Sequence, residues 1–205
     1  MKLYEIHISI NINNGMDEIK WLYFCIDNNY KPIRVLNDIG KHNIQYMIAK
    51  WCNRDNDKDV INYANKINKK FIKAGFKVTR IKVEAMMLNK DYDNLVLEDF
   101  KNDIYWEIHF KISIKNYEEL KKLLNWKKTS GYSNIGLSIS SFGENKYPII
   151  TIRHNFGEKE TIINYKNIII DDLKNNGFHI TDKIQREISI YDTNPDEDKG
   201  WISKL

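Results

Sequence analysis

The sequence repeats itself after 102 residues, and this repeat constrains the possible folds more than any other feature. Three motifs return with the same offset: Glu5-Ile6-His7 as Glu107-Ile108-His109, Ile61-Asn62-Tyr63 as Ile163-Asn164-Tyr165, and Gly75-Phe76 as Gly177-Phe178. Chance matches between short motifs would not keep one offset along most of a repeat. The chain is therefore predicted to contain two copies of one structural unit of about 100 residues.

Hydrophobic periodicity predicts the same order of elements in both copies. Apolar and polar residues alternate over 3–10 and 105–114, as expected for half-buried strands. Apolar residues at helical spacing follow, and they are Ile19, Leu22, Tyr23 and Ile26 in the first copy and Tyr117, Leu120, Leu123 and Leu124 in the second. Two short strands, a second helix and a last strand complete each copy, at 31–36, 44–52, 58–74 and 76–88 and at 133–141, 147–155, 159–176 and 178–191.

This β-α-β-β-α-β order is that of a ferredoxin-like unit. We therefore predict an α+β protein of two tandem ferredoxin-like repeats, each with an antiparallel four-stranded sheet and both helices on one face. The fourth strand of each sheet is expected to pair with the first. The predicted divisions are a first repeat over 1–90, a linker over 91–103, a second repeat over 104–192 and a C-terminal tail over 193–205.

Composition restricts the partners and the compartment. The 32 basic and 28 acidic residues are interspersed, which disfavours a nucleic-acid partner. No apolar stretch has the length of a membrane span, no signal peptide is recognisable, and Cys25 and Cys52 lack metal-binding spacing. We expect a cytoplasmic protein, or one inside a host cell, that is not secreted. Frequent Ile, Asn, Lys and Tyr are typical of an A+T-rich genome such as that of a virus or phage.

Strand alternation also sorts the polar residues into faces. The apolar residues of each first strand must contact the helices, so Glu5 and His7 are predicted to point to the helix-free face of the sheet. The last strand contributes a carboxylate beside them because it neighbours the first. The candidate site residues on this face are Glu5, His7 and Glu84 in the first repeat and Glu107, His109, Lys111, Arg153 and Glu187 in the second.

These residue types support more than one interpretation. If the two helix-free faces meet, the residues line an internal cleft. Carboxylates and an imidazole can bind a divalent cation, and His7 and His109 are the candidate catalytic acid and base. Ordinary cross-strand pairing with Lys or Arg would account for the same residues without any ligand.

Two motifs resemble those of phosphate-processing enzymes. Glu107-x-His109-x-Lys111 is similar to the first-strand E-x-E-x-K motif of the triphosphate tunnel metalloenzymes, with His in place of the second Glu. That resemblance implies carboxylates that hold metal and basic residues that hold triphosphate. His7-Ile8-Ser9-Ile10 resembles the H-Φ-[ST]-Φ motif of the two-histidine phosphoesterases, and the second copy has Lys111 at the Ser/Thr position.

The second repeat also resembles an uncharacterised group of bacterial and viral proteins. The resemblance rests on Glu107-x-His109, Arg186-Glu187, Tyr191-Asp192-x-Asn194 and Gly200-Trp201, and it implies no activity.

Motifs of common enzyme classes are missing from the sequence, including phosphate-binding glycine loops, H-E-x-x-H and the nucleophile elbow. The leading hypothesis is therefore a non-catalytic module that binds an unknown ligand or protein. The alternative is a divalent-metal-dependent phosphohydrolase or nucleotide-binding enzyme with its site on the helix-free sheet faces. Oligomeric state is left open.

Overall fold

The computed structural model describes residues 1–86, 105–132, 135–140, 147–155 and 159–198. The first half contains β1 (Lys2–Asn11), α1 (Gly15–Asp27), β2 (Lys31–Asn37), β3 (Ile44–Arg54), α2 (Asp57–Lys73) and β4 (Lys77–Met86). The second half contains β5 (Tyr105–Ser113), α3 (Tyr117–Thr129), β6 (Ile135–Ser140), β7 (Pro148–Asn155), α4 (Lys159–Asn175) and β8 (His179–Asp192), and a short 3-10 turn η3 (Pro195–Asp198) follows. The predicted order of elements is present in both halves, and the predicted linker lies outside the described residues.

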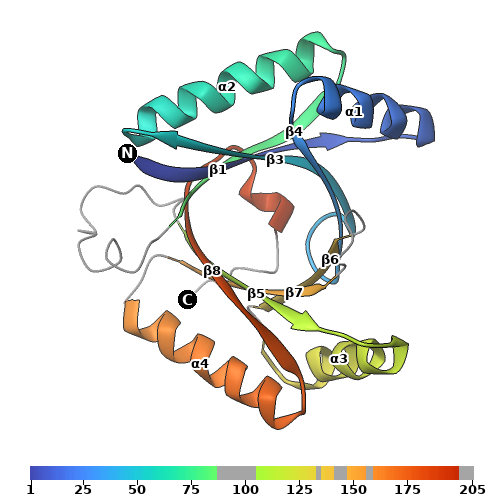
Figure 1. The fold of residues 1–205 in the computed structure, drawn as a ribbon, viewed down its shortest axis with the longest axis vertical. Coiled ribbons are helices and arrows are strands. Elements are labelled where there is room, and N and C mark those ends of the chain that lie inside the picture. The colour runs from blue at the N-terminus through green and yellow to red at the C-terminus, as the bar shows by residue number, and fades with distance from the viewer. Residues whose placement is uncertain (87–104, 133–134, 141–146, 156–158, 199–205) are drawn as a thin grey trace.

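All eight strands form one closed antiparallel barrel in the order β1-β3-β2-β6-β7-β5-β8-β4 (Figure 1). Within each half the fourth strand pairs with the first, as predicted. Two further pairings, β2 with β6 and β4 with β8, join the halves into a single sheet. The prediction of two tandem ferredoxin-like repeats with separate four-stranded sheets is therefore wrong.

The physical reason for closure lies at the sheet edges. Two open sheets would leave the backbone groups of β2, β4, β6 and β8 unpaired, and such edges invite unwanted pairing with other chains. In the barrel each of these strands has a partner on both sides. Asp38 extends the β2–β6 contact, since its backbone N donates to Leu137 O at 3.0 Å and its carboxylate accepts from Leu137 N at 2.7 Å. Closure also turns both helix-free faces into a shared lumen.

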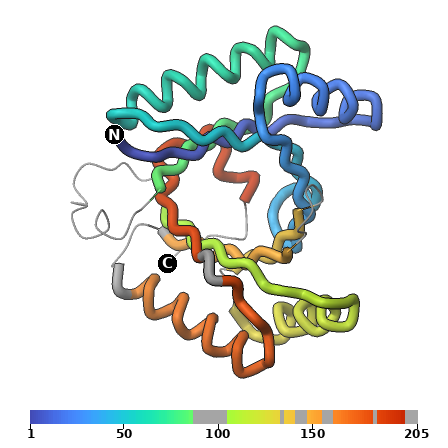
Figure 2. The backbone as a smooth tube through the Cα atoms, in the orientation of Figure 1, coloured from blue at the N-terminus to red at the C-terminus, as the bar shows by residue number. Residues whose placement is uncertain are grey.

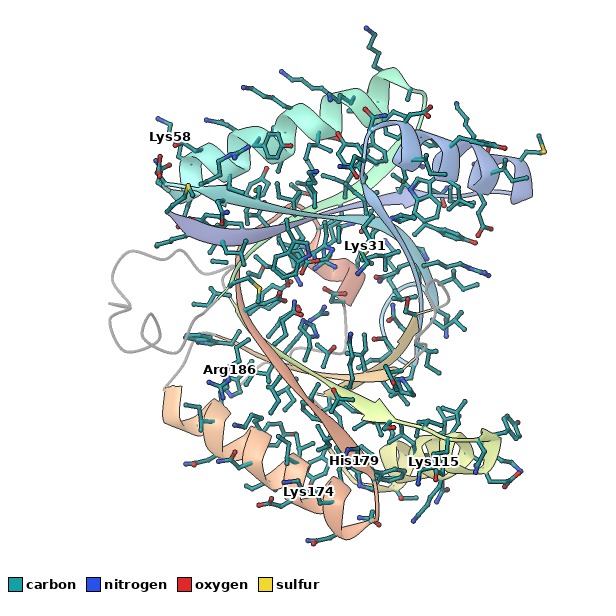
Figure 3. The ribbon with its side chains drawn as sticks, viewed as in Figure 1. Lys31, Lys58, Lys115, Lys174, His179 and Arg186 are labelled. Carbon is teal, nitrogen blue, oxygen red and sulfur yellow. The ribbon has the colours of Figure 1, made fainter. Side chains whose placement is uncertain are left out.

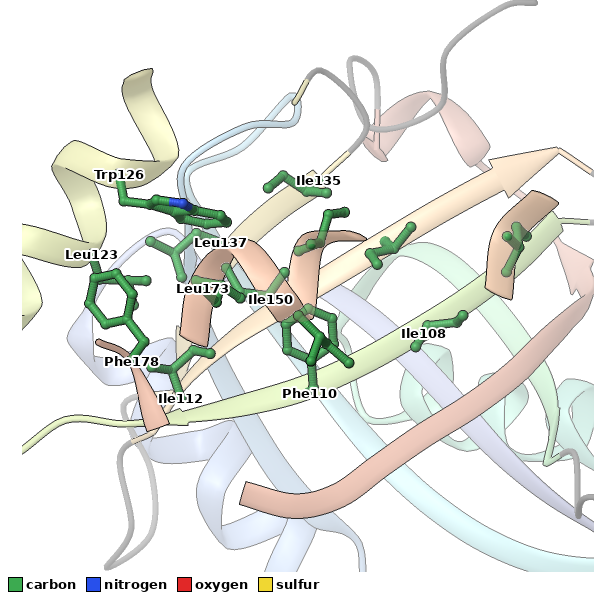
Figure 4. Close-up of a cluster of buried hydrophobic side chains, with 14 of the residues drawn as sticks. Ile108, Phe110, Ile112, Leu123, Trp126, Ile135, Leu137, Ile150, Leu173 and Phe178 are labelled. Carbon is green, nitrogen blue, oxygen red and sulfur yellow. The ribbon is translucent and has the colours of Figure 1, made fainter. Parts of the chain in front are cut away.

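The four helices lie outside the barrel in two groups (Figures 1 and 2). α1 and α2 cover the strands of the first half, and α3 and α4 cover those of the second. Each group buries its own hydrophobic core against the outer face of the barrel. Phe110, Leu123 and Trp126 belong to the second core, where Phe110 and Leu123 are fully buried (Figure 4). None of the described helices combines the length and apolar character needed to cross a membrane.

Short-range chemistry fixes the helix ends. Asn14, Asn56 and Asn116 are the N-caps of α1, α2 and α3, and each side chain accepts hydrogen bonds from backbone N–H groups of the first turn. The Glu119 carboxylate accepts from Lys115 N rather than from Asn116 N, so the sequence pattern of a capping box is only half realised. Gly75 and Gly177, which follow α2 and α4, have φ values of 83° and 81°, the left-handed conformation that favours glycine.

The buried face of α1 differs from the predicted one. Ile19, Tyr23 and Ile26 were expected to face the core, yet they are 48%, 65% and 70% exposed. Trp21 and Cys25 are fully buried instead. Both sets have helical spacing, so the sequence offers two apolar stripes, and the barrel buries the one that contains Trp21.

Candidate functional site

The inner face of the barrel surrounds a cavity of about 250 Å³. Figure 3 shows side chains filling much of the ring between the strands. Every site residue predicted from the sequence lies on the cavity wall, and they are Glu5, His7, Glu84, Glu107, His109, Lys111, Arg153 and Glu187. The two sets that the sequence assigned to separate repeats therefore form one site.

Alternation along the strands places these residues in the lumen. Tyr4, Ile6 and Ile8 of β1 are fully buried in the outer core, so Glu5 and His7, which alternate with them, point inward. On β5, Ile108 and Phe110 contact the second core in the same way, and His109 between them points inward.

Glu107 is the centre of the charged cluster in the second half. Its side chain is 1% exposed, and one carboxylate oxygen is contacted by Lys82 Nζ at 2.6 Å and by Arg153 Nε. Its other oxygen lies 3.0 Å from His109 Nε2. The same imidazole nitrogen is 3.1 Å from Glu187 Oε2. Each buried charge thus has partners of the opposite sign, as a low-dielectric interior requires.

The first half contributes a matching cluster that is linked to Glu107. His7 Nε2 lies 2.9 Å from Glu84 Oε2 and 3.8 Å from Glu5 Oε2. Lys82 Nζ lies 2.5 Å from Glu84 Oε1, so this ammonium bridges carboxylates of both halves. Gln185 Nε2 donates to Glu5 Oε2 at 3.2 Å. One network therefore crosses the lumen.

Burial and charge act in opposite directions on the carboxylates. Burial alone would raise the pKa of Glu107, but Arg153, Lys82 and His109 hold the pKa of that carboxyl well below its usual value. Burial raises the pKa of Glu5 to about 7, because His7 offsets burial only partly and Glu187 and Glu84 repel the charged form. The equivalent carboxylates of the two repeats therefore differ in their proton affinity.

Both lumen histidines are held as cations by carboxylates. Burial would lower the pKa of His7, but Glu5 and Glu84 raise it to about 9. Burial would also lower the pKa of His109, but hydrogen bonds to Glu107 and Glu187 raise it to about 10. At neutral pH both rings are imidazolium ions, with two N–H donors each.

Several residues of the network were not among the predicted site residues. The most important of them are Arg80, Lys82, Thr151, Gln185, Asp192 and Asp198. Arg80 and Lys82 share the inward face of β4 with Glu84, two residues apart along the strand, so alternation could have revealed them. Asp198 gave no such signal, because it follows the last strand and reaches the lumen only through the η3 turn.

Two groups of side chains have the geometry of a metal site. Glu84, Glu107, His109 and Glu187 offer ligand atoms that all lie within 4.8 Å of one another, and so do Glu5, His7 and Glu84. Carboxylate oxygens suit Mg²⁺ and Mn²⁺. Lys82 Nζ contacts Glu107 of the first group and Glu84 of both groups, so a bound cation would compete with this ammonium.

The wall opposite the charged network has a different chemistry. It is built from β2, β3, β6 and the part of β7 around Ile149, and its apolar members are Ile33, Val35, Met47 and Ile149. Neutral polar side chains lie among them, including Asn37, Gln45 and Ser138. The cavity is therefore charged on one side and largely uncharged on the other.

A comparison of the halves isolates one hydrogen bond. Thr151 and Ala49 occupy equivalent positions, opposite His109 and His7 in the barrel. The Thr151 hydroxyl is 2.8 Å from His109 Nδ1, whereas the buried Nδ1 of His7 has no hydrogen-bond partner among the described residues. An unpaired buried donor costs about 1–3 kcal/mol.

Exchanging these residues should therefore shift stability in opposite directions. Thr151→Ala is expected to lower the free energy of unfolding by about 1–3 kcal/mol, because it removes the partner of His109 Nδ1. Ala49→Thr is expected to raise the free energy of unfolding by up to about 1 kcal/mol, because the new hydroxyl supplies a hydrogen-bond partner to His7 Nδ1. Urea denaturation of both variants measures these changes. Equal and small effects of the two substitutions would contradict the assignment of these hydrogen bonds.

Alkaline pH should destabilise the protein through the same histidines. Their pKa values rise on folding, so the stability they contribute is complete below about pH 6.5 and is lost as the pH rises through about 9 for His7 and about 10 for His109. We expect the free energy of unfolding to fall by about 2 kcal/mol or more between pH 7 and pH 9. Urea denaturation at the two pH values tests this. His109→Gln should flatten the dependence, and the exposed His42→Gln should leave it unchanged.

A scan of the chain against protein-family models found no match, and a search of curated proteins found none either. The function must therefore be inferred from the lumen itself.

Proposed function

We propose that this protein is a binding protein that encloses a small molecule in the lumen of its barrel. The observation that carries the proposal is the cavity of about 250 Å³, with a charged network on one wall and aliphatic and neutral polar side chains on the other. Eight-stranded barrels are wide enough to hold one small ligand, and ligand pockets combine apolar surface with a few placed polar groups. This size suits a small metabolite.

The cost of the charged network supports a binding role. Burying several ion pairs stabilises a protein no better than apolar residues of similar volume would. Glu84, Glu107 and Glu187 are each 1% exposed, so their desolvation is nearly complete. A ligand that contacts the network would supply a reason for keeping charges in this position. The inward orientation of the site residues also favours a small ligand over a protein partner.

Thermal melting with a panel of charged metabolites tests the proposal. A ligand at a hundred times its dissociation constant stabilises the folded state by about 2.7 kcal/mol, which corresponds to a rise in melting temperature of about 5–10 °C for a chain of this size. Val35→Trp would fill the uncharged side of the cavity and should abolish the shift.

Leu36→Trp is the matched control for that variant. Leu36 is the next residue of β2, is 43% exposed and lies outside the cavity, so a Trp there should leave ligand binding intact. If no ligand raises the melting temperature, or if Val35→Trp binds as well as Leu36→Trp, the lumen is not the binding site. A denaturation curve for each variant establishes that it folds.

A metal-dependent phosphohydrolase or nucleotide-binding enzyme is the second candidate function. It is favoured by the two groups of carboxylates and histidines whose ligand atoms lie within 4.8 Å of one another. Melting curves with Mg²⁺, Mn²⁺ and nucleotides, together with phosphatase assays, distinguish the candidates. Turnover that requires the metal and disappears in Glu187→Gln would support the enzyme, and ligand binding without metal or turnover would support the binding protein.

A further inference from the structure

The C-terminal η3 turn places a carboxylate in the lumen. In Figure 1 this turn lies within the ring of strands, and Asp198 at its end is 3% exposed and lines the cavity. The turn carries no residue of either hydrophobic core. The other described carboxylates on the cavity wall belong to the strands β1, β4, β5 and β8, so Asp198 is the one held there by a turn.

Asp198 joins two arginines from different halves of the barrel. One of its oxygens, Oδ2, is contacted by Arg80 Nη2 of β4 and lies 2.7 Å from Arg153 Nη1 of β7. Two guanidinium groups that converge on one oxygen are a common arrangement for binding phosphate and carboxylate groups.

The arginines do not depend on Asp198 for their position. Arg80 Nε donates to Asp192 Oδ1 at 2.9 Å, and Arg80 Nη2 donates to Tyr105 OH at 3.0 Å. Arg153 Nε contacts Glu107. If Asp198 moved away, both guanidinium groups would keep a carboxylate partner and would still face the same point in the cavity.

The η3 turn is attached mainly by polar contacts. Lys41 N donates to Glu197 O at 3.0 Å, and Asn194 Nδ2 donates to Thr79 O at 3.2 Å. Pro195 and Asp196 are exposed. Segments with few buried apolar contacts open at a smaller free-energy cost than core strands do.

We propose that Asp198 occupies the subsite of the lumen that receives an anionic group of the ligand, and that a phosphate or carboxylate of the ligand displaces it. The inference rests on the proposed function and adds the chemical class of the ligand: an anion with an oxygen that fits between Arg80 and Arg153. The unliganded protein holds its own carboxylate there, which neutralises the arginines until the ligand arrives.

Isothermal titration of the full chain with inorganic phosphate and with acetate tests this subsite and separates the two anion types. Asp198→Asn keeps the shape of the turn but removes the competing charge, so it should bind at least one of these probes about ten times more tightly than the wild type. Glu197→Gln removes a charge from the same turn without touching either arginine, and it should bind like the wild type. Equal affinities of all three proteins, or equal gains in both variants, would overturn the proposal.

Hydrogen exchange provides a second readout that needs no substitution. The Lys41 amide donates to Glu197, so saturating phosphate or acetate should speed its exchange in the wild type if the anion displaces the turn. Unchanged exchange at saturation would count against displacement. The tests also separate the two proposals. If Asp198→Asn binds the anion more tightly, but no metabolite is found whose binding Val35→Trp abolishes, the results would support the subsite and not the binding protein.

Discussion

Replacing Glu107 with Gln is expected to lower the free energy of unfolding by about 3–5 kcal/mol, the cost of breaking a buried ion pair by removing one partner. The Glu107 side chain is 1% exposed, and it neutralises Lys82 and Arg153 with one oxygen and contacts His109 with the other. A neutral amide leaves these cations in the lumen with too little negative charge. Urea denaturation monitored by circular dichroism measures the loss.

Glu118→Gln is the matched control for Glu107→Gln. The Glu118 side chain is 78% exposed and lies 3.7 Å from Lys121, so removing its charge should cost less than about 0.5 kcal/mol. A double-mutant cycle with Lys82→Met then isolates the pair: the double variant should lose less than the sum of the single losses, because no ammonium is left without a partner. If the losses of the two single variants add up strictly in the double variant, or if Glu107→Gln alone loses less than about 1 kcal/mol, the Glu107 carboxylate contributes little to neutralising the cations of the network.

The importance of Glu107 could be anticipated only in part from the sequence. Alternation along the first strands placed Glu5, His7, Glu107 and His109 on the helix-free face, and the structure has them there because Ile6 and Ile108 enter the hydrophobic cores. Alternation also places Lys82 on the inward face, but the sequence gives no sign that Lys82 is the partner of Glu107. Lys82 belongs to the other repeat, and it reaches Glu107 only because the barrel closes.

Closure itself leaves no local pattern in the sequence. The pairings of β2 with β6 and of β4 with β8 are made by backbone hydrogen bonds between segments far apart in the chain. Backbone groups are the same in every residue, so alternation predicts which side chains face inward but not whether the sheet edges meet. The constant offset of 102 residues also hides a shift of one residue in the last strand. Glu84 lies opposite Glu5, and Glu187 lies opposite Glu107, so the two equivalent residues are 103 positions apart (187 − 84).

Closure links the charged lumen to both proposals. As two open sheets, the repeats would expose their carboxylates and imidazoles to water, where ion pairs contribute little. Inside the barrel the same groups are desolvated, the two histidines become cations, and Arg80 and Arg153 converge on Asp198. A ligand anion would interact more strongly with Arg80 and Arg153 there than with arginines at an exposed surface, because the effective dielectric constant is lower.

The largest effect expected outside the lumen concerns α1, where the sequence offered two possible buried faces. Trp21→Ala is expected to lower the free energy of unfolding by about 3–5 kcal/mol, since Trp21 is fully buried and packs edge-on against Tyr46 with ring centroids 5.5 Å apart. Tyr23→Ala removes a ring of similar size two residues along the same helix, but Tyr23 is 65% exposed, so the loss should stay within about 0.5 kcal/mol.

Urea denaturation of Trp21→Ala and Tyr23→Ala under one set of conditions decides which face of α1 contacts the barrel. The helix propensities of Trp and Tyr are close, so both substitutions change the intrinsic stability of the helix by a similar amount. The difference between the two losses therefore reports burial. A larger loss for Tyr23→Ala would mean that α1 is rotated about its axis so that Ile19, Tyr23 and Ile26 pack inward, and the core of the first half would have to be rebuilt around that stripe.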